Sequence, residues 1–233
     1  MPPSSAIRHL LSAALIPLTL SVLAAVGITW VCGGTLGVYI GALLAVTLLI
    51  PPTVSASQRS FDRRLIVWLV VAPLAAAWLS TARRTGTTMG EWGASSAVLL
   101  AYAIALAGTV SALPLLRLSA IVSAAMTVVL GLAWLTWPIW LSRTWNGEAS
   151  AAWVNRLVVV HPALSVSLPH LGHWDEQSLA YHLTDLNQSV PYAPPHSVWV
   201  CVIVHALVGA VLFELSGLLA RRDADASDLH PAP

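Results

Sequence analysis

The chain has 233 residues, of which 57% are hydrophobic and 9% are charged, and its formal net charge is +1. A soluble domain carries about 25% charged residues, so these charges could not cover a water-soluble surface. The near-neutral charge also excludes the basic footprint of a nucleic-acid-binding protein. The apolar residues fall in long uninterrupted runs, which is typical of segments that span a bilayer. We therefore expect an all-α, polytopic bundle of membrane helices.

Six apolar segments are predicted to cross the membrane. They are about Leu10–Val31, Leu36–Ile50, Leu65–Thr81, Ser95–Leu116, Ala120–Leu141 and Val198–Ala220. Pro51 and Pro52 cannot donate backbone hydrogen bonds, so we expect the second helix to end or bend there. The predicted organisation is five transmembrane helices in residues 1–141, a polar insert in 142–197, a sixth helix in 198–222 and a disordered cytoplasmic tail in 223–233.

Prolines also lie inside four of the other predicted helices, at Pro17, Pro73, Pro114 and Pro138. Each one removes a backbone donor and can kink its helix. Transporters line substrate sites with interrupted helices, but prolines are also ordinary in membrane helices. The prolines alone do not decide between these interpretations.

The arginine distribution predicts the orientation of the chain. Six crossings place both termini on one side, and cytoplasmic termini leave seven arginines in the inner segments and four in the outer ones. This distribution follows the positive-inside rule. Most tryptophans fall at the opposite ends of the predicted helices, as an interfacial belt would. We expect a multi-pass protein of the bacterial cytoplasmic (inner) membrane, with both termini in the cytoplasm and the polar insert outside it.

The polar insert Ser142–Ser197 is the only long polar interval, and it holds five of the eight histidines. Its apolar segment Trp153–Val160 is too short to cross a bilayer and is predicted to form an interfacial or re-entrant helix. A second, amphipathic helix is predicted to begin at Asp175, because Asp is a good N-cap. The candidate functional residues of this extracytoplasmic insert are His161, His182 and Asp185.

A metal site is one interpretation of the same insert. His170 and His173 lie three residues apart, and Asp175 and Glu176 follow them. Imidazole and carboxylate groups together suit Zn²⁺ or Cu²⁺. No HExxH pattern is present, and surface histidines that respond to pH are the alternative. A divalent metal is therefore the one cofactor that the sequence leaves open.

Two ionisable residues interrupt the last predicted span, His205 and Glu214. Titratable groups inside a membrane are costly, which makes both of them candidates for a substrate or proton path. They lie nine residues apart, or two and a half helical turns, so they point to opposite faces. The alternatives are an ion pair of Glu214 with Arg117 or Arg221, and a neutral His205 bonded to a neighbouring helix.

Three further patterns have a structural and a functional interpretation each. Gly33, Gly37 and Gly41 recur every four residues, which predicts close helix packing, either within the chain or in a dimer. The aromatic stripe of Trp134, Trp137 and Trp140 predicts interfacial anchoring, with ligand binding as the alternative. Cys32 and Cys201 could form a disulfide or be two small buried side chains.

The chain contains no GxSxG, Walker, GxGxxG or kinase-type motif, so we expect it not to hydrolyse nucleotides itself and identify no catalytic residue. Six spans, cytoplasmic termini and short helices between the last two spans resemble the membrane subunit of an ABC-2-type exporter, in architecture rather than in motif. Unlike that family, the chain has only Met1–His9 before the first span. The resemblance implies a separate ATPase partner and a homo- or hetero-oligomer.

The first functional hypothesis is therefore a permease-like transport subunit that is not itself an enzyme and is embedded in the lipid bilayer. The second is a membrane-embedded metal protein or enzyme that uses the histidines and carboxylates of the insert. The third is a non-catalytic accessory subunit of a larger membrane complex.

Overall fold

The computed structural model describes residues 3–32, 35–57, 60–141, 148–166 and 197–229, and all of its regular elements are helical. The elements are α1 (Pro3–Val31), α2 (Thr35–Ser55), α3 (Ser60–Arg84), α4 (Met89–Ala112), the 3-10 turn η1 (Leu113–Leu116), α5 (Ala120–Leu141), α6 (Glu148–Val160) and α11 (Trp199–Leu229). Six of them, α1 to α5 and α11, are long and apolar enough to cross a membrane. The all-α, six-span prediction is confirmed, and the chain is an integral, multi-pass membrane protein.

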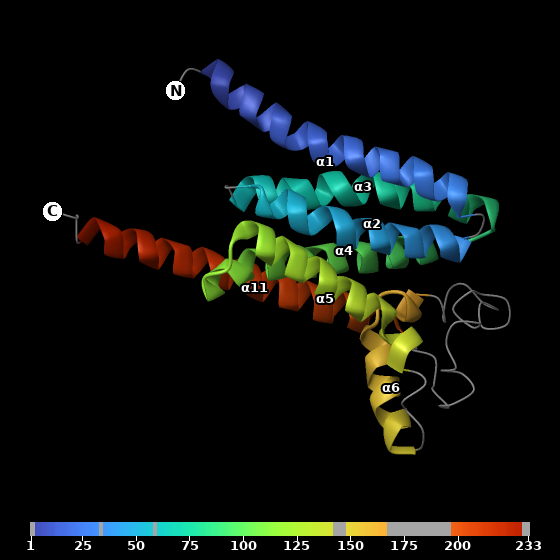
Figure 1. Ribbon diagram of the computed structural model, residues 1–233. Helices are drawn as coiled ribbons and strands as arrows, with labels where there is room; N and C mark the ends of the chain where they lie inside the picture. Colours follow the sequence, from blue (N-terminus) through green and yellow to red (C-terminus); the bar gives the residue numbers. More distant parts are fainter. Residues whose placement is uncertain (1–2, 33–34, 58–59, 142–147, 167–196, 230–233) are drawn as a thin grey trace.

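The six long helices run roughly along one common direction and form an elongated bundle (Figure 1). Both termini lie at the same end of this bundle, which we call the terminal end. The turn between α3 and α4 lies at the other end, together with α6, and we call it the α6 end. This arrangement follows from an even number of crossings.

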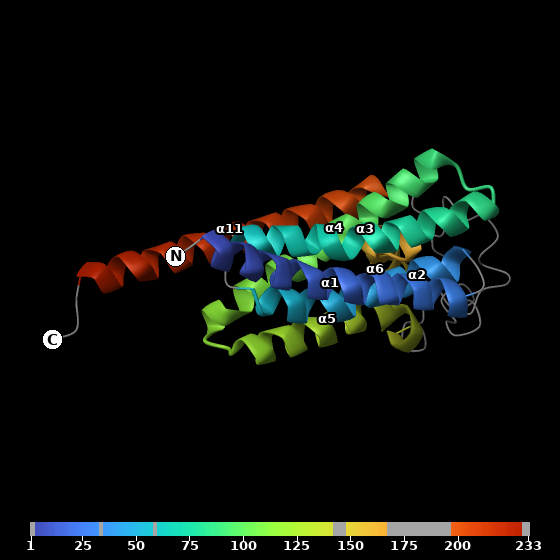
Figure 2. The same ribbon diagram turned by 90° about the horizontal axis from the view of Figure 1, so that it is seen from above.

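Helix α4 is the centre of the bundle. It packs against α2, α3, α5 and α11, and 61% of its apolar window is buried, against 17% for α1 and for α11. Helix α1 packs on α2 and α3 at one side of the bundle, whereas α11 packs on α4 (Figure 2). The outward faces of α1 and α11 are apolar and exposed, as lipid-facing surfaces should be.

Two glycines allow α4 and α11 to approach closely. A Cβ atom added at Gly108 would lie 2.5 Å from the carbonyl oxygen of Gly209. A Cβ atom at Gly209 would lie 2.5 Å from the carbonyl oxygen of Ile104. Contacts this short cannot form with a side chain present, so the crossing depends on both glycines.

Several helices extend beyond their predicted ends. Helix α2 continues through Pro51 and Pro52 to Ser55, so of the two alternatives at the double proline, an end or a bend, the end is wrong. The φ angle of proline is compatible with a helix, and membrane helices tolerate the lost donors. Helix α4 begins at Met89 because Thr88 and Glu91 form a capping box, in which Glu91 N–H donates to Thr88 Oγ1 and Thr88 N–H to Glu91 Oε2.

Helix α11 also runs on to Leu229, through most of the tail that we expected to be disordered. The residues after Ala220 include several good helix formers, and they continue a helix that is already nucleated in the span. The helical conformation of this segment therefore costs no new nucleation step.

The short helix α6 contains the predicted interfacial segment and runs across the end of the bundle rather than along it (Figure 1). After Val160 the chain turns back, and His161, Leu164, Ser165 and Val166 are buried. We call residues 161–166 the buried turn. The second predicted helix, which begins at Asp175, lies outside the described residues.

Candidate functional site

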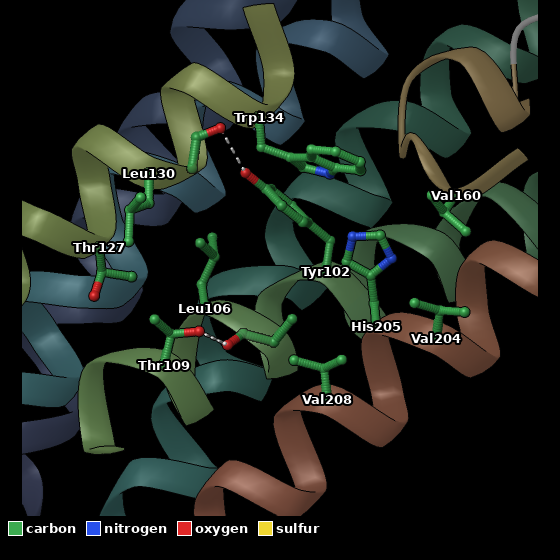
Figure 3. A pocket seen from close by; sticks show the side chains of 12 residues that line it. Tyr102, Leu106, Thr109, Thr127, Leu130, Trp134, Val160, Val204, His205 and Val208 are labelled. Carbon is green, nitrogen blue, oxygen red and sulfur yellow. Dashed lines mark hydrogen bonds between the residues drawn. The ribbon is translucent and has the colours of Figure 1, made fainter. Parts of the chain in front are cut away.

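A pocket of about 340 Å³ lies between α4, α5 and α11, within their membrane-spanning parts (Figure 3). It is lined by Tyr102, Ala105, Leu106, Thr109, Thr127, Leu130, Gly131, Trp134, Val160, Val204, His205 and Val208. Both α5 and α11 pack on α4, but over the described residues they do not form a packed interface with each other. Leu130 and Val208 remain about half exposed, at 53% and 47%. The pocket therefore opens sideways, between α5 and α11, toward the lipid.

His205 brings a titratable ring to the wall of this pocket. Its side chain is largely buried, with 8% exposed, and its ring points toward Tyr102 and Trp134 (Figure 3). Nδ1 lies 2.9 Å from the carbonyl oxygen of Cys201, one turn earlier in α11. A carbonyl oxygen can only accept, so Nδ1 carries the proton and Nε2 is left as an acceptor in the neutral ring. The described residues provide no partner for Nε2.

Two aromatic side chains face His205 across the pocket. The Tyr102 ring lies edge-on to the imidazole, with centroids 5.7 Å apart, and the Trp134 ring lies at 6.4 Å. The Tyr102 hydroxyl is already occupied, because it donates to the carbonyl oxygen of Gly131 (3.2 Å) and lies 3.0 Å from Thr47 Oγ1. The Trp134 indole N–H, in contrast, is buried without a partner among the described residues. Thr109 and Thr127 also line the pocket, and their hydroxyls donate to the backbone carbonyls of Ala105 and Ser123. Beside the imidazole, the groups without a partner among the described residues are thus one acceptor, His205 Nε2, and one donor, the buried Trp134 N–H.

A second histidine, His161, binds the backbone of α5 next to the pocket residue Trp134. Pro138 has no N–H, so the carbonyl oxygen of Trp134 lacks its usual donor four residues later. His161 Nε2 lies 3.1 Å from this oxygen and 3.3 Å from that of Leu135. Leu164 N–H donates to His161 Nδ1 at 3.2 Å, which fixes the tautomer with the proton on Nε2. His161 therefore replaces the donor that the proline removes.

The surroundings of His161 keep it uncharged. Burial is the main cause that lowers its pKa to about 4, the two backbone carbonyls oppose this shift, and nearby His205 lowers the pKa further. The rings of Trp134 and Trp137 lie 5.7 and 5.8 Å from the imidazole. Trp137 is 3% exposed, so the prediction that the stripe anchors at the interface is wrong for this residue, whereas Trp134 is half-buried with its indole nitrogen covered. They turn inward because the buried turn offers apolar surface; the Trp140 side chain lies outside the description.

The buried turn is also held by α2 and α11. The Tyr39 hydroxyl lies 3.4 Å from the carbonyl oxygen of Pro162, and the Cys201 thiol donates to that of Val160 at 3.3 Å. Both cysteines are free thiols, so the disulfide between Cys32 and Cys201 is not formed. Val160, the residue directly before this turn, lines the pocket at the α6 end.

Glu214 is not among the residues that line the pocket. It is 71% exposed and forms an ion pair of 3.4 Å with Arg64 of α3. The structure thus pairs it with a residue that we did not predict, and Arg117 is not its partner; the Arg221 side chain is not described. His205 is buried and Glu214 is exposed, in agreement with the prediction that they occupy opposite faces. Only His205 belongs to the site.

The glycine pattern of α2 packs within the chain. A Cβ atom at Gly41 would lie 2.7 Å from Ile28 Cγ2 of α1, and one at Gly37 would lie 3.2 Å from Cys32 Cβ. These contacts account for the close approach of α1 and α2 without a second copy of the chain. Gly33 lies outside the described residues.

Most candidates of the polar insert also lie outside the described residues. They are His170, His173, Asp175, Glu176, His182 and Asp185. Within the part of the chain that is described, no three His, Cys, Asp or Glu side chains come close enough to hold a metal ion. The metal hypothesis therefore stays a prediction about the insert.

Sequence reasoning identified His205 and His161 but did not connect them, and it missed Tyr102. The role of His161 could have been anticipated in part, because Pro138 leaves the Trp134 carbonyl oxygen without its usual backbone donor. No comparable signal marks Tyr102, whose importance arises from the helices around it. Comparison with known proteins finds no match to this chain among protein families, curated proteins or solved structures.

Proposed function

We propose that the chain is the permease-like subunit of a transporter that obtains its energy from a separate ATPase chain. One observation carries the proposal, namely the pocket inside the membrane-spanning bundle, close to the position where Pro138 removes a backbone donor from α5. Transporters bind substrates near the middle of the bilayer, where helices are interrupted and titratable groups are tolerated. His205 is such a group, and it faces the pocket.

The proposed energy source follows from the architecture. The sequence has no nucleotide-binding motif, so ATP hydrolysis must occur on another chain. The resemblance to ABC-2-type exporter subunits supports the same division of labour, with a partner ATPase and a dimer of membrane subunits. In this proposal the terminal end faces the cytoplasm, where the partner would bind.

Affinity purification of the tagged protein from its native membranes in a mild detergent tests the proposal. We expect an ATPase subunit among the co-purifying proteins, identified by mass spectrometry, and ATP hydrolysis by the complex. Recovery of the protein alone, or with partners that do not bind nucleotide, would contradict the proposal and favour the accessory-subunit hypothesis.

A pair of substitutions links the pocket to this activity. Ala105 lines the pocket and Ala210 is exposed on α11, so Ala105→Phe fills the pocket whereas Ala210→Phe adds the same ring on the lipid side. We expect both variants to assemble with the ATPase, and only Ala105→Phe to change its rate of hydrolysis in nanodiscs by more than about twofold. Equal rates for the two variants would argue against a role of the pocket.

A further inference from the structure

We propose that the pocket binds a lipid alcohol, meaning an apolar chain that ends in one neutral hydroxyl group, and that this molecule enters from the bilayer between α5 and α11. The inference names the substrate class of the proposed transport subunit and rests on that function. Three properties of the pocket carry it, namely its opening, its lack of charge and its two unused hydrogen-bonding atoms.

The opening determines where the ligand comes from. Leu130 and Val208 are about half exposed at the rim, and Val204 beside them is 38% exposed. These apolar side chains lie within the spans of α5 and α11, so the rim meets lipid tails rather than water. Val160, directly before the buried turn, lines the pocket at the α6 end. The part of the ligand that crosses the rim must therefore be apolar.

The lining excludes a charged headgroup. None of the described residues that line the pocket is an Arg, Asp or Glu, and the chain has no Lys. A phosphate, carboxylate or ammonium group would lose its hydration here without a counter-charge, which costs far more than burial of a neutral group. The volume of about 340 Å³ is near the lower limit for small-molecule sites. It suits a headgroup and the first part of a chain, with the remainder in the bilayer.

The two unused atoms select a hydroxyl group. His205 Nε2 can only accept in the neutral ring, and the Trp134 indole N–H can only donate. Figure 3 shows the indole nitrogen on the ring edge that faces Tyr102 and His205. A carbonyl oxygen could satisfy Trp134 alone, whereas a hydroxyl can accept from Trp134 and donate to His205. The Trp134 N–H is buried, so the indole turns slightly to reach the ligand, and the new bond offsets the cost of leaving it unpaired.

Photolabelling of the purified full-length protein in nanodiscs tests the inference. The probe is a hexadecanol analogue with a diazirine next to the hydroxyl end. Competitors are hexadecanol, hexadecanoic acid and hexadecane, which share a chain length and differ in the head. We expect labelled peptides from α4, α5 and α11, with hexadecanol competing at least about tenfold better than the acid or the alkane.

Matched variants separate the headgroup contact from general lipid binding. Trp134→Phe removes the indole donor and His205→Phe removes the acceptor, and both keep an aromatic ring. Each is expected to lower labelling about three- to tenfold, the worth of one hydrogen bond. Trp199→Phe is the control, because Trp199 is 56% exposed and does not line the pocket, and it should leave labelling unchanged. Thermal unfolding of each variant verifies that it is folded.

The outcomes distinguish this inference from the transport proposal. Equal competition by hexadecane, preference for the acid, or labelling that is unaffected in both pocket variants would overturn the lipid-alcohol site. If that happens while an ATPase co-purifies, the transport proposal stands with another substrate class. If the alcohol binds as expected but no ATPase is found, the site stands and the transport proposal fails.

Discussion

His161 supplies a hydrogen-bond donor that the backbone of α5 lacks at Pro138. Pro138 leaves the Trp134 carbonyl oxygen without a donor at membrane depth, where water cannot replace it. His161 Nε2–H reaches that oxygen at 3.1 Å from a different element. The backbone of α5 around Pro138 and the buried turn are therefore joined by a single imidazole.

A double-mutant cycle tests this connection. His161→Ala should lower the free energy of unfolding by about 3 kcal/mol, because it leaves buried carbonyl groups unpaired and creates a cavity. Pro138→Ala restores a backbone N–H that can bond to Trp134, so His161→Ala should cost about 1–2 kcal/mol less in that background. Unfolding by titration with SDS measures all four proteins. Additive costs would show that His161 and Pro138 are not coupled.

The protonation of His161 predicts a pH dependence of stability. Its pKa is lowered from 6.5 to about 4 in the folded protein, so between these values the unfolded chain binds the proton and the folded one does not. Its stabilising contribution is complete above about pH 6.5 and is lost as the pH falls toward 4, by about 3 kcal/mol in total. Thermal unfolding from pH 4 to 8 should show this loss, and His161→Gln should show a smaller one. An equal pH dependence in both proteins would contradict the assignment.

The sequence predicted individual residues only where the signal is local. His205 was recognisable because an ionisable group in an apolar run is rare. The partners of Glu214, Trp134 and Trp137 were not, because each depends on which helix lies alongside. The tryptophan stripe shows the limit well, since three-residue spacing fits an interfacial belt and a buried wall equally. Only the position of the buried turn decides between them.

At the scale of elements, the contact between α4 and α11 depends on the absence of side chains. Gly209→Ala places a methyl group within 2.5 Å of the Ile104 carbonyl oxygen, so the two helices must move apart. We expect the variant to unfold at a markedly lower temperature, with a loss of about 2 kcal/mol or more. Gly217→Ala on the same helix is the control, because a Cβ atom there meets nothing within 4 Å. That variant should be neutral or slightly stabilised, since alanine favours helix. Similar melting temperatures for the two variants would refute the close crossing.

The centres of the predicted helices agree with the structure better than their ends do. Hydropathy sums over about twenty residues, so the existence of each span is a strong signal. Ends depend on a few atoms, such as the hydroxyl of Thr88 that begins α4. Helix α5 begins at the predicted residue because the left-handed Arg117 ends the preceding 3-10 turn and the Ser119 hydroxyl accepts a hydrogen bond from Val122 N–H in the first turn of α5. The end of α2 was predicted wrongly because the double proline removes two backbone donors, but proline can still adopt the φ angle of a helix.

At the scale of the whole molecule, the order of spans along the sequence does not reveal which of them are neighbours. The pocket needs α4, α5 and α11 together, and α11 follows a long insert. An apolar stripe on each helix would have indicated which face packs against a neighbour. These helices are instead apolar on most faces, because they contact lipid as well as each other. The site therefore depends on helix packing that cannot be predicted from composition. Of the residues that line it, only His205 could be recognised from the sequence.

The even number of crossings makes the orientation of the molecule testable. Ala56 directly follows α2 at the terminal end and Arg84 is the last residue of α3 at the α6 end, and both are exposed. In a Cys32→Ser background, we expect Arg84→Cys to react with a membrane-impermeant maleimide added to intact cells, and Ala56→Cys to react only after the membrane is opened. The physical reason is that the sequence predicts seven arginines in the cytoplasmic segments and four in the outer ones, and arginine-rich segments are retained in the cytoplasm. The reverse pattern would show that the protein is inverted, and reaction of both sites from one side would show that the six-span bundle is miscounted.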